Sequence, residues 1–380
     1  MRRFIHDPIT LMSQKIKFRN VQDANFTTTL NLRIQDYFKQ NHITDKGNAL
    51  MAFKVIFFLA GFVGSYLLIY LSGDNFIASL GSWLLLGLFT AFVGFNISHD
   101  AVHGSLSENK YINKILGYTF NLAGTNKYMW KLMHNVIHHT YTNIPGHDED
   151  LEPVSFIRLS TENKLKKIHR FQHWYAYFFY CLTSISWVFK KDFSSFFRKK
   201  LGNYDNKKHP VKEYIILFIS KAVYFALFLV LPIALIDLPW WMTTIGFVSM
   251  HFIQGITLAV VFQLAHVVEG ATFPAPDEKG DIMNNWTIHQ LNTTANFAMK
   301  SPLAAWFFGG LNFQVEHHLF PHICHIHYPQ LAPIVKQTAK EFGISYHENT
   351  TMWDAIKSHT RMLKLLGRFD VLPSATATAA

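Results

Sequence analysis

The stretch that decides the fold is FIASLGSWLLLGLFTAFVGFNISHDAVH, residues 76–103. Its first part, residues 76–96, is an apolar run close to the ~20 residues that a helix needs to cross a bilayer. Just beyond it, His99 and His103 are four residues apart, which places both rings on one face of a helix. The stretch predicts a spanning helix that ends in a pair of candidate metal ligands, although this spacing also arises by chance.

Three further apolar runs of similar length surround this stretch, at residues 53–71, 214–236 and 240–263. Short turns at 72–75 and 237–239 join them in pairs, so they predict two tight hairpins. The composition agrees, since 49% of the residues are hydrophobic and only 16% are charged, against roughly 25% in an average soluble protein. We therefore predict an all-α integral membrane protein with two transmembrane helical hairpins (four spans) and a cytoplasmic helical cap that holds a two-metal site.

The distribution of charge predicts the orientation. Neither short turn contains Lys or Arg, whereas residues 1–54 and the loop 97–213 are rich in both. Both termini and the loop should therefore face the cytoplasm. The apolar segment 171–189 is expected to lie in the membrane interface, because a fifth span would separate His317 and His318 from the other histidines. With a net charge of +10, we expect anionic lipid or an acidic protein as partner, and no nucleic acid.

The rest of the chain divides around this core. Residues 1–50 are expected to form a solvated cytoplasmic extension, in which the amphipathic stretch 26–38 could form an interfacial or packing helix. Residues 51–345 should form the main domain, and residues 346–380 a cytoplasmic segment with a disordered tail. Lys221 should extend from the third span to the surface. His251, in the middle of the fourth span, is either functional or a neutral histidine bonded to a neighbouring helix. Only two cysteines occur and they form no C-x-x-C pair, which argues against a disulfide framework or a cysteine-bound metal.

Two more histidine clusters follow in the sequence. His134, His138 and His139 lie within HNVIHH, where helical geometry puts the first two on one face and rotates the third by ~100°. Gln314, His317 and His318 lie within QVEHH and share a helical face, and Pro321 should end that helix before His322, His325 and His327. His266 follows the fourth span, at the same depth as His99.

The two-hairpin topology brings every cluster to one membrane face. Imidazole suits iron, copper, zinc or nickel, and eight histidines are too many for one zinc ion. Two metals with open coordination positions are therefore expected. Residues that could support such a site by accepting a ring N–H or by orienting a ligand are Asp100, Asn143, Asp148, Asp150, His289 and Glu316.

The motifs HDAVH, HNVIHH and QVEHH resemble the three histidine boxes of the membrane fatty acid desaturases. The Gln that opens the third box, together with HQLNTTANF (289–297) and HHLFP (317–321), is similar to the front-end branch, the Δ5/Δ6 acyl-lipid and linoleoyl-CoA type. The resemblance covers residues 50–345. It implies a di-iron site that uses O₂ and two electrons to introduce a cis double bond into an acyl-CoA or acyl-lipid chain. The implied iron ligands are His99, His103, His134, His138, His139, His266, His317 and His318, with Gln314 as a weak ligand or a residue that orients water.

Many front-end desaturases carry a fused cytochrome b5 domain with an HPGG motif, and the sequence contains no such motif. We therefore expect a separate electron donor, a ferredoxin or a cytochrome b5 with its reductase, docked on the basic cytoplasmic face. An enzyme of this kind would suit a bacterial inner membrane.

Three alternatives remain open at this point. A hydroxylase, ketolase or sphingolipid-type oxygenase could use the same scaffold, because the sequence does not fix whether the oxidant yields an alkene or an alcohol. An intramembrane zinc protease is suggested by HDAVH, one methylene short of HExxH, but it leaves the other clusters without a role. A metal transporter would need histidines along the spans, where only His251 lies deep.

Overall fold

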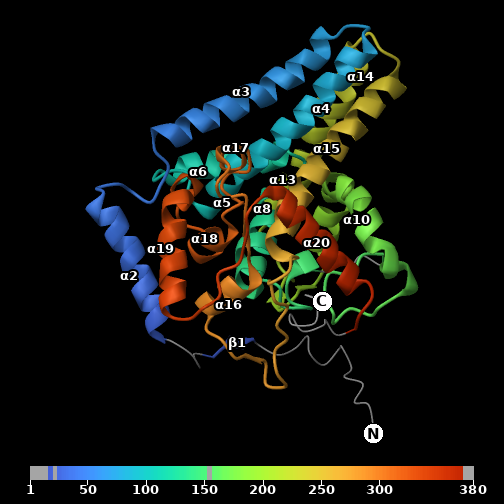
Figure 1. The fold of residues 1–380 in the computed structure, drawn as a ribbon. Helices are drawn as coiled ribbons and strands as arrows, with labels where there is room; N and C mark the ends of the chain where they lie inside the picture. The colour runs from blue at the N-terminus through green and yellow to red at the C-terminus, as the bar shows by residue number, and fades with distance from the viewer. Residues whose placement is uncertain (1–15, 20–23, 152–155, 371–380) are drawn as a thin grey trace.

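The protein is built mostly of helices, as the computed structural model shows (Figure 1). The structure describes residues 16–19, 24–151 and 156–370, so the tail predicted to be disordered, residues 373–380, lies outside the described residues. The α-helices are α2 (Ala24–Gln40), α3 (Ala49–Leu71), α4 (Phe76–Val93), α5 (His99–His103), α6 (Lys110–Leu116), α7 (Thr119–Leu122), α8 (Lys127–Lys131), α9 (His139–Tyr141), α10 (Gln172–Cys181), α11 (Thr183–Ser186), α12 (Asp192–Phe197), α13 (Val211–Phe225), α14 (Leu231–Leu235), α15 (Trp240–His266), α16 (Trp286–Thr293), α17 (Pro302–Phe307), α18 (Gln314–Leu319), α19 (Tyr328–Glu341) and α20 (Met352–Leu366).

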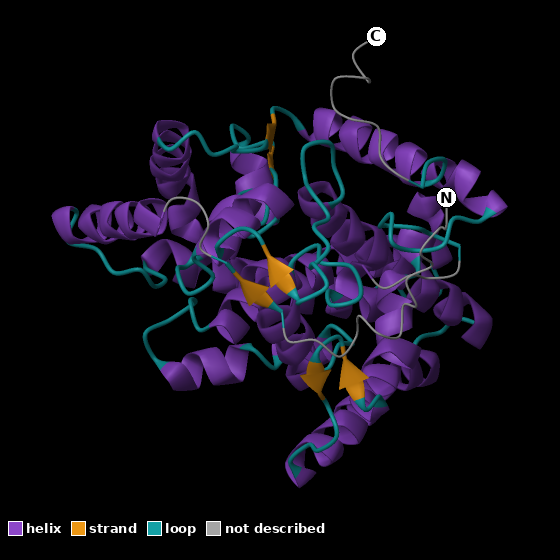
Figure 2. Cartoon of the chain, turned by 90° about the horizontal axis from the view of Figure 1, so that it is seen from below, coloured by secondary structure: helices purple, strands orange, loops and turns teal. Residues whose placement is uncertain are grey.

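Shorter elements connect these helices. The π-helical segments are η1 (Gly94–Ser98), η2 (Leu132–His138), η5 (Trp187–Lys191) and η6 (Ala226–Val230), and the 3₁₀ turns are η3 (Glu149–Leu151), η4 (Lys167–Phe171) and η7 (His325–His327). The strands form two-residue pairs, seen as short arrows among the helices in Figure 2. They are β1 (Lys17–Phe18) parallel to β4 (Asp281–Ile282), β2 (Lys200–Leu201) antiparallel to β3 (Tyr204–Asp205), and β5 (Asn296–Phe297) parallel to β6 (Glu348–Asn349).

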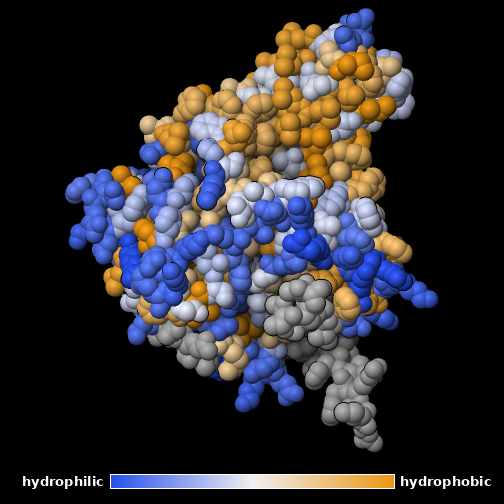
Figure 3. Space-filling model, viewed as in Figure 1, coloured by the Kyte–Doolittle hydropathy of each residue, from blue (hydrophilic) through white to orange (hydrophobic). Residues whose placement is uncertain are grey.

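Four of the described helical runs are long and apolar enough to cross a membrane: Ala49–Leu71, Phe76–His103, Val211–Leu235 and Trp240–His266. They confirm the predicted four-span, all-α membrane fold. Figure 3 shows their apolar surface as a continuous orange region, with the hydrophilic cap below it. The segment predicted to lie in the interface is not among the runs long enough to span. It forms α10 and α11, which pack along α15.

Helix α4 packs against both α3 and α15 and so joins the two hairpins. The backbones of α4 and α15 approach closely, since a Cβ on Gly87 would lie 2.4 Å from the carbonyl oxygen of Met250. Small residues permit this kind of packing between spanning helices. As a result, the cap-side ends of α4 and α15 are held next to each other.

The second span is longer than its apolar run suggests. After α4, the helix continues through η1 and α5 to His103, and it ends at Gly104, whose φ of 73° is a left-handed conformation favoured by glycine. Asn96 is accommodated inside this run because its side-chain amide donates to the carbonyls of Phe92 and Phe307. His99 and His103 are therefore carried on a rigid extension of the span, and not on a separate element.

Both end segments of the described chain belong to the cap. Helix α2 buries Phe26, Leu30 and Ile34, an i, i+4, i+8 stripe, against α19. Of the two expectations for residues 26–38, the structure shows the packing helix and not a solvated segment. Near the other end, α20 packs on α10 and α15.

Two polar residues of the spans are fully engaged inside the protein. The expectation that Lys221 reaches the surface is wrong, because its ammonium is buried and donates to Asp192 (2.7 Å) and to the carbonyl of Gly124 (2.6 Å). Asp192 begins α12, which folds back against the span. The ring nitrogens of His251 bond the hydroxyls of Ser184 and Tyr224, each at 2.9 Å, which is the hydrogen-bonded alternative of the two considered for this residue.

Candidate metal centre

All eight predicted histidine ligands converge where the cap meets the spans. They come from α5, from η2 and α9, from the end of α15, and from α18. Their ligand atoms fall into groups whose members lie within 4.8 Å of one another. The groups are a four-histidine set (His99, His103, His134, His317), a three-histidine set (His138, His266, His318) and a set that links them (His139, His317, His318).

The π-helical turn of η2 sets the relative positions of the three histidines in the second cluster, His134, His138 and His139. A π-helix forms i→i+5 hydrogen bonds and therefore winds more loosely than an α-helix, and His139 follows His134 by five residues. Their Nε2 atoms lie 3.2 Å apart. Ordinary α-helical geometry predicted instead that His139 would be rotated by ~100°, so that it reaches a second metal or approaches from a neighbouring angle. The π-helix therefore brings all three imidazoles of this cluster toward one centre.

Several cluster imidazoles have a buried ring nitrogen without a hydrogen-bond partner in the described chain: His103 Nε2, His138 Nε2, His139 Nδ1, His317 Nε2 and His318 Nε2. A buried polar atom left unpaired costs roughly 1–3 kcal/mol. So many unpaired nitrogens in one place need a common partner. Metal ions accept lone pairs from imidazole nitrogens, so these residues fit a metal centre.

The opposite ring nitrogens of several cluster histidines are held by neighbours. His138 Nδ1 lies 3.0 Å from Asp148 Oδ2, and His318 Nδ1 lies 2.8 Å from the side-chain oxygen of Gln290. His266 Nδ1 faces the carbonyl of Thr293 at 3.3 Å. An acceptor at Nδ1 fixes the proton there and leaves Nε2 free to bind a metal.

The residues expected to support the site divide into two sets. Four of them lie next to the cluster. Asp100 lies 3.6 Å from His99 Nδ1 and 2.8 Å from His325 Nδ1, so His325 reaches the site only through Asp100. Asp148 contacts His138 as above, and the Oδ2 of Asp150 lies 3.6 Å from the same His138 nitrogen. The backbone N–H of Asn143 donates to Asp148 at 2.9 Å, and its side chain donates to the carbonyl of His266.

The other two lie away from the imidazoles. His289 packs its ring on Phe18 at 5.0 Å, while the next residue of α16, Gln290, points to His318. Glu316 sits on the other side of α18 from the histidines and accepts from Asn296 and from Tyr346, each at 2.8 Å. Gln290 was missed, although it lies in the HQLNTTANF segment that drew attention to His289. Tyr328, with its hydroxyl 3.4 Å from His317 Nδ1, carried no signal in the sequence.

Burial sets the protonation of the cluster. It lowers the pKa far below the usual histidine value, with crowding by other imidazoles adding to the effect, for His134, His139, His317 and His318. These rings are neutral at physiological pH, which is the form that binds metals. At His138 burial acts in the same direction, but the charge and hydrogen bond of Asp148 outweigh it and raise the pKa. Burial also raises the pKa of Glu316 to about 7.

Gln314 joins the three-histidine set through its side-chain amide, which lies 3.0 Å from His266 Nε2. This set therefore contains an amide where the other set has a fourth imidazole. An amide is a weaker metal ligand than an imidazole, so the two sets are chemically unequal.

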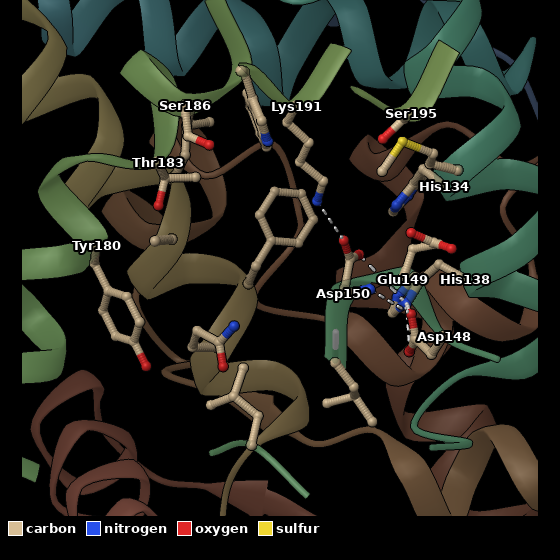
Figure 4. Close-up of a pocket in the computed structure, with 18 of the residues that line it drawn as sticks. His134, His138, Asp148, Glu149, Asp150, Tyr180, Thr183, Ser186, Lys191 and Ser195 are labelled. Carbon is tan, nitrogen blue, oxygen red and sulfur yellow. Dashed lines mark hydrogen bonds and ion pairs between the residues drawn. The ribbon is translucent and has the colours of Figure 1, made fainter. Parts of the chain in front are cut away.

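A cavity of about 640 Å³ opens beside the cluster (Figure 4). His134, His138 and His266 form part of its wall. Much of the remainder is apolar and comes from α10, η5 and α15, including Phe179, Trp187, Leu258, Ala259 and Phe262. Lys191 and Asp150 form an ion pair inside it. A long apolar chain could therefore lie against the walls with one segment next to the imidazoles.

Comparison with known proteins agrees with this geometry. Residues 75–350 match the family model described as fatty acid desaturase. The chain is 35% identical to the sn-1 linoleoyl-lipid 6-desaturase of Arthrospira platensis, over 94% of this chain and 96% of the relative. It is 36% identical to the enzyme of the same name from Synechocystis sp., over 94% and 99%. It is also 33% identical to the acyl-lipid (8-3)-desaturase of Physcomitrium patens, over 93% and 74%.

The histidine sets, the four spans and these relatives together support both the predicted family and its front-end type. This chain belongs to the fatty acid desaturase family of membrane oxidoreductases.

Proposed function

We propose that the protein introduces a cis double bond into an acyl chain carried by a membrane lipid, with two histidine-bound iron ions, O₂, and electrons from a separate donor protein. The observation that carries the proposal is the convergence of unpartnered imidazole nitrogens at one side of a largely apolar cavity. The relatives named linoleoyl-lipid desaturases support a lipid-borne substrate.

The four-histidine set would hold one iron, and the three-histidine set with Gln314 would hold the other, with His139 between them. When bound, the irons supply the activation of O₂ that removes two hydrogens from adjacent carbons. The side chains of Asp148 and Gln290 keep the protons of His138 and His318 on Nδ1, away from the centre. His99, His103 and His266 are carried on the ends of spans, so the helix packing itself fixes their positions.

The cavity would position the acyl chain and exclude water from the metal centre. Apolar side chains such as Leu258 and Phe262 would hold the chain and exclude water beside the imidazoles. Holding one carbon pair next to the reacting centre can lower a barrier by roughly 7–11 kcal/mol. The protein's contribution is therefore to select the carbon pair.

Orientation and electron supply complete the proposal. Both termini and the metal centre would face the cytoplasm of a bacterium whose inner membrane holds the spans, in keeping with the Lys- and Arg-rich cap. A ferredoxin or a cytochrome b5 with its reductase would deliver electrons to the basic face. The purified protein should therefore turn over only when such a donor is added, and turnover with NADPH and O₂ alone would contradict this part.

The test is expression in a host that lacks polyunsaturated fatty acids, supplied with a panel of fatty acids, followed by double-bond mapping of each lipid class. We expect a new cis double bond in lipid-bound chains and about two iron ions per purified chain. A hydroxylated product would favour the oxygenase alternative, and a double bond formed only on acyl-CoA would contradict the lipid-borne substrate. Zinc in place of iron would exclude the proposed chemistry.

A further inference from the structure

Part of the cavity wall carries charge, although much of the lining is apolar. Lys191, at the end of η5, reaches into the cavity toward Asp150 of η3, and the two groups lie 3.4 Å apart (Figure 4). Arg198 pairs with Glu149 on the same wall. A hydrocarbon chain cannot form hydrogen bonds or ion pairs with such groups. The charged residues therefore indicate that a polar part of the substrate also enters the cavity.

The ammonium of Lys191 has N–H donors that its contact with Asp150 does not use. Its ammonium has three N–H donors, and Asp150 is the one side-chain acceptor that it contacts among the described residues. The 3.4 Å separation is longer than the usual 2.7–3.2 Å of an N–H···O bond. The side chain of Lys191 is 31% exposed and that of Asp150 is 43% exposed, so a ligand in the cavity can reach the ammonium without displacing a buried pair.

We propose that Lys191 binds the carbonyl oxygen of the substrate's acyl group and so determines which carbon pair is desaturated. The inference rests on the proposed function and adds a specificity residue to it. The carbonyl is the polar group shared by lipid esters and thioesters, so the role does not depend on the carrier. A carbonyl oxygen accepts hydrogen bonds, and an ammonium donor makes the bond stronger than a neutral donor would.

The position of Lys191 relative to the histidines predicts where along the acyl chain the double bond forms. Asp150 contacts Lys191 through one oxygen and lies 3.6 Å from His138 Nδ1 through the other. A single carboxylate therefore separates the ammonium from the imidazoles. A carbonyl held at Lys191 leaves room for only a short run of methylenes before the metal centre. The rest of the chain continues along apolar residues such as Leu258 and Phe262. The double bond should accordingly fall near the carbonyl end, at a position counted from it.

The test compares Lys191→Met, which removes charge and donors at similar length, with Lys191→Arg, which keeps a cationic donor. Lys207→Met is the matched control, because Lys207 also pairs with an aspartate, Asp205 at 3.2 Å, but both side chains are about 60% exposed and neither lines the cavity. The product of each variant is analysed by double-bond mapping, and iron per chain is measured.

We expect one positional isomer from the wild type, from Lys207→Met and, at lower rate, from Lys191→Arg. In Lys191→Met, the ratio of the main isomer to neighbouring isomers should fall roughly tenfold or more, as expected for loss of a charge-assisted hydrogen bond. Lys191→Gln should give a smaller fall in the same ratio, and it carries the test if the methionine variant does not accumulate.

The outcomes separate the two proposals. A single unchanged isomer from Lys191→Met or Lys191→Gln with normal iron content, even at a reduced rate, overturns the role of Lys191 and leaves the desaturase proposal intact. Absence of any desaturated product from the wild type with a donor present rejects the proposed function itself.

Discussion

Helix α15 carries two buried histidines with different surroundings. In the middle of the helix, both ring nitrogens of His251 bond hydroxyls, those of Ser184 and Tyr224. At the end of the helix, His266 faces imidazoles, with ring centroids 4.7 Å from His138 and 4.9 Å from His318. Both residues are almost inaccessible to solvent.

The difference shows that burial alone does not identify a metal ligand. Both ring nitrogens of His251 bond hydroxyls of neighbouring helices, so this residue stabilises helix packing. A histidine among other imidazoles, several of them with unpaired nitrogens, has a function that the protein groups alone do not satisfy. The four predictions below test this distinction between a histidine held by hydroxyls and histidines grouped with other imidazoles.

The largest effect is expected from His318→Ala. It removes an imidazole that belongs to two of the ligand sets, so activity should fall by more than the roughly 10–100-fold typical of losing an outer partner of a ligand. The control is His322→Ala, which removes an exposed histidine of the same segment and should leave activity unchanged. Membrane insertion of both variants is checked by fractionation. Full activity of His318→Ala would remove His318 from the ligand set.

Metal removal should abolish activity without unfolding the spans. Because the unpaired nitrogens lie at the cap, a chelator should remove iron and activity together while the helical content of the spans remains. Circular dichroism, iron analysis and turnover are followed in one titration. Addition of Fe²⁺ should restore turnover and Zn²⁺ should not. Activity that persists after all iron has been removed would contradict the assignment of the unpaired nitrogens to iron.

An intermediate effect is expected from Gln290→Leu. The variant removes the acceptor that holds the N–H of His318 at 2.8 Å, so iron affinity or turnover should fall roughly 10–100-fold. Gln337→Leu is the matched control, since Gln337 is exposed and bonds only Glu341 among the described side chains. Isothermal titration of iron into the metal-free protein measures the iron affinity of each variant. Equal affinity in both variants would show that Gln290 does not support His318.

The smallest effect on catalysis is expected from His251→Ala. The loss of two buried hydrogen bonds should lower the free energy of unfolding by about 1–3 kcal/mol, seen as a lower Tm of the detergent-purified protein. Turnover per iron should remain at the wild-type level, because His251 contacts no member of the ligand sets. A loss of bound iron in this variant would contradict the distinction between the middle and the end of α15.

The sequence predicted those features that depend on residue type and local spacing. Hydropathy located the four spans, and the two-hairpin topology brought His99, His134, His266 and His317 to one face. It failed where a contact joins residues distant in the chain. Lys221 was expected at the surface because its partner Asp192 precedes it by 29 positions and lies on another element. Gln290 was overlooked beside His289, since only the orientation of α16 decides which of the two faces His318.

What the sequence alone determined is the chemistry available at this site: a membrane-embedded helical scaffold with clustered imidazoles at one end, because hydrophobicity and ligand type are properties of single residues. What only the tertiary structure decided is how those imidazoles are shared. The π-helical turn brought His139 to His134, the packing of α18 placed Gln314 on His266, and Asp150 joined Lys191 to the cluster. The last two depend on the relative placement of elements distant in the sequence, and the first depends on a π-helical turn that residue spacing alone does not predict.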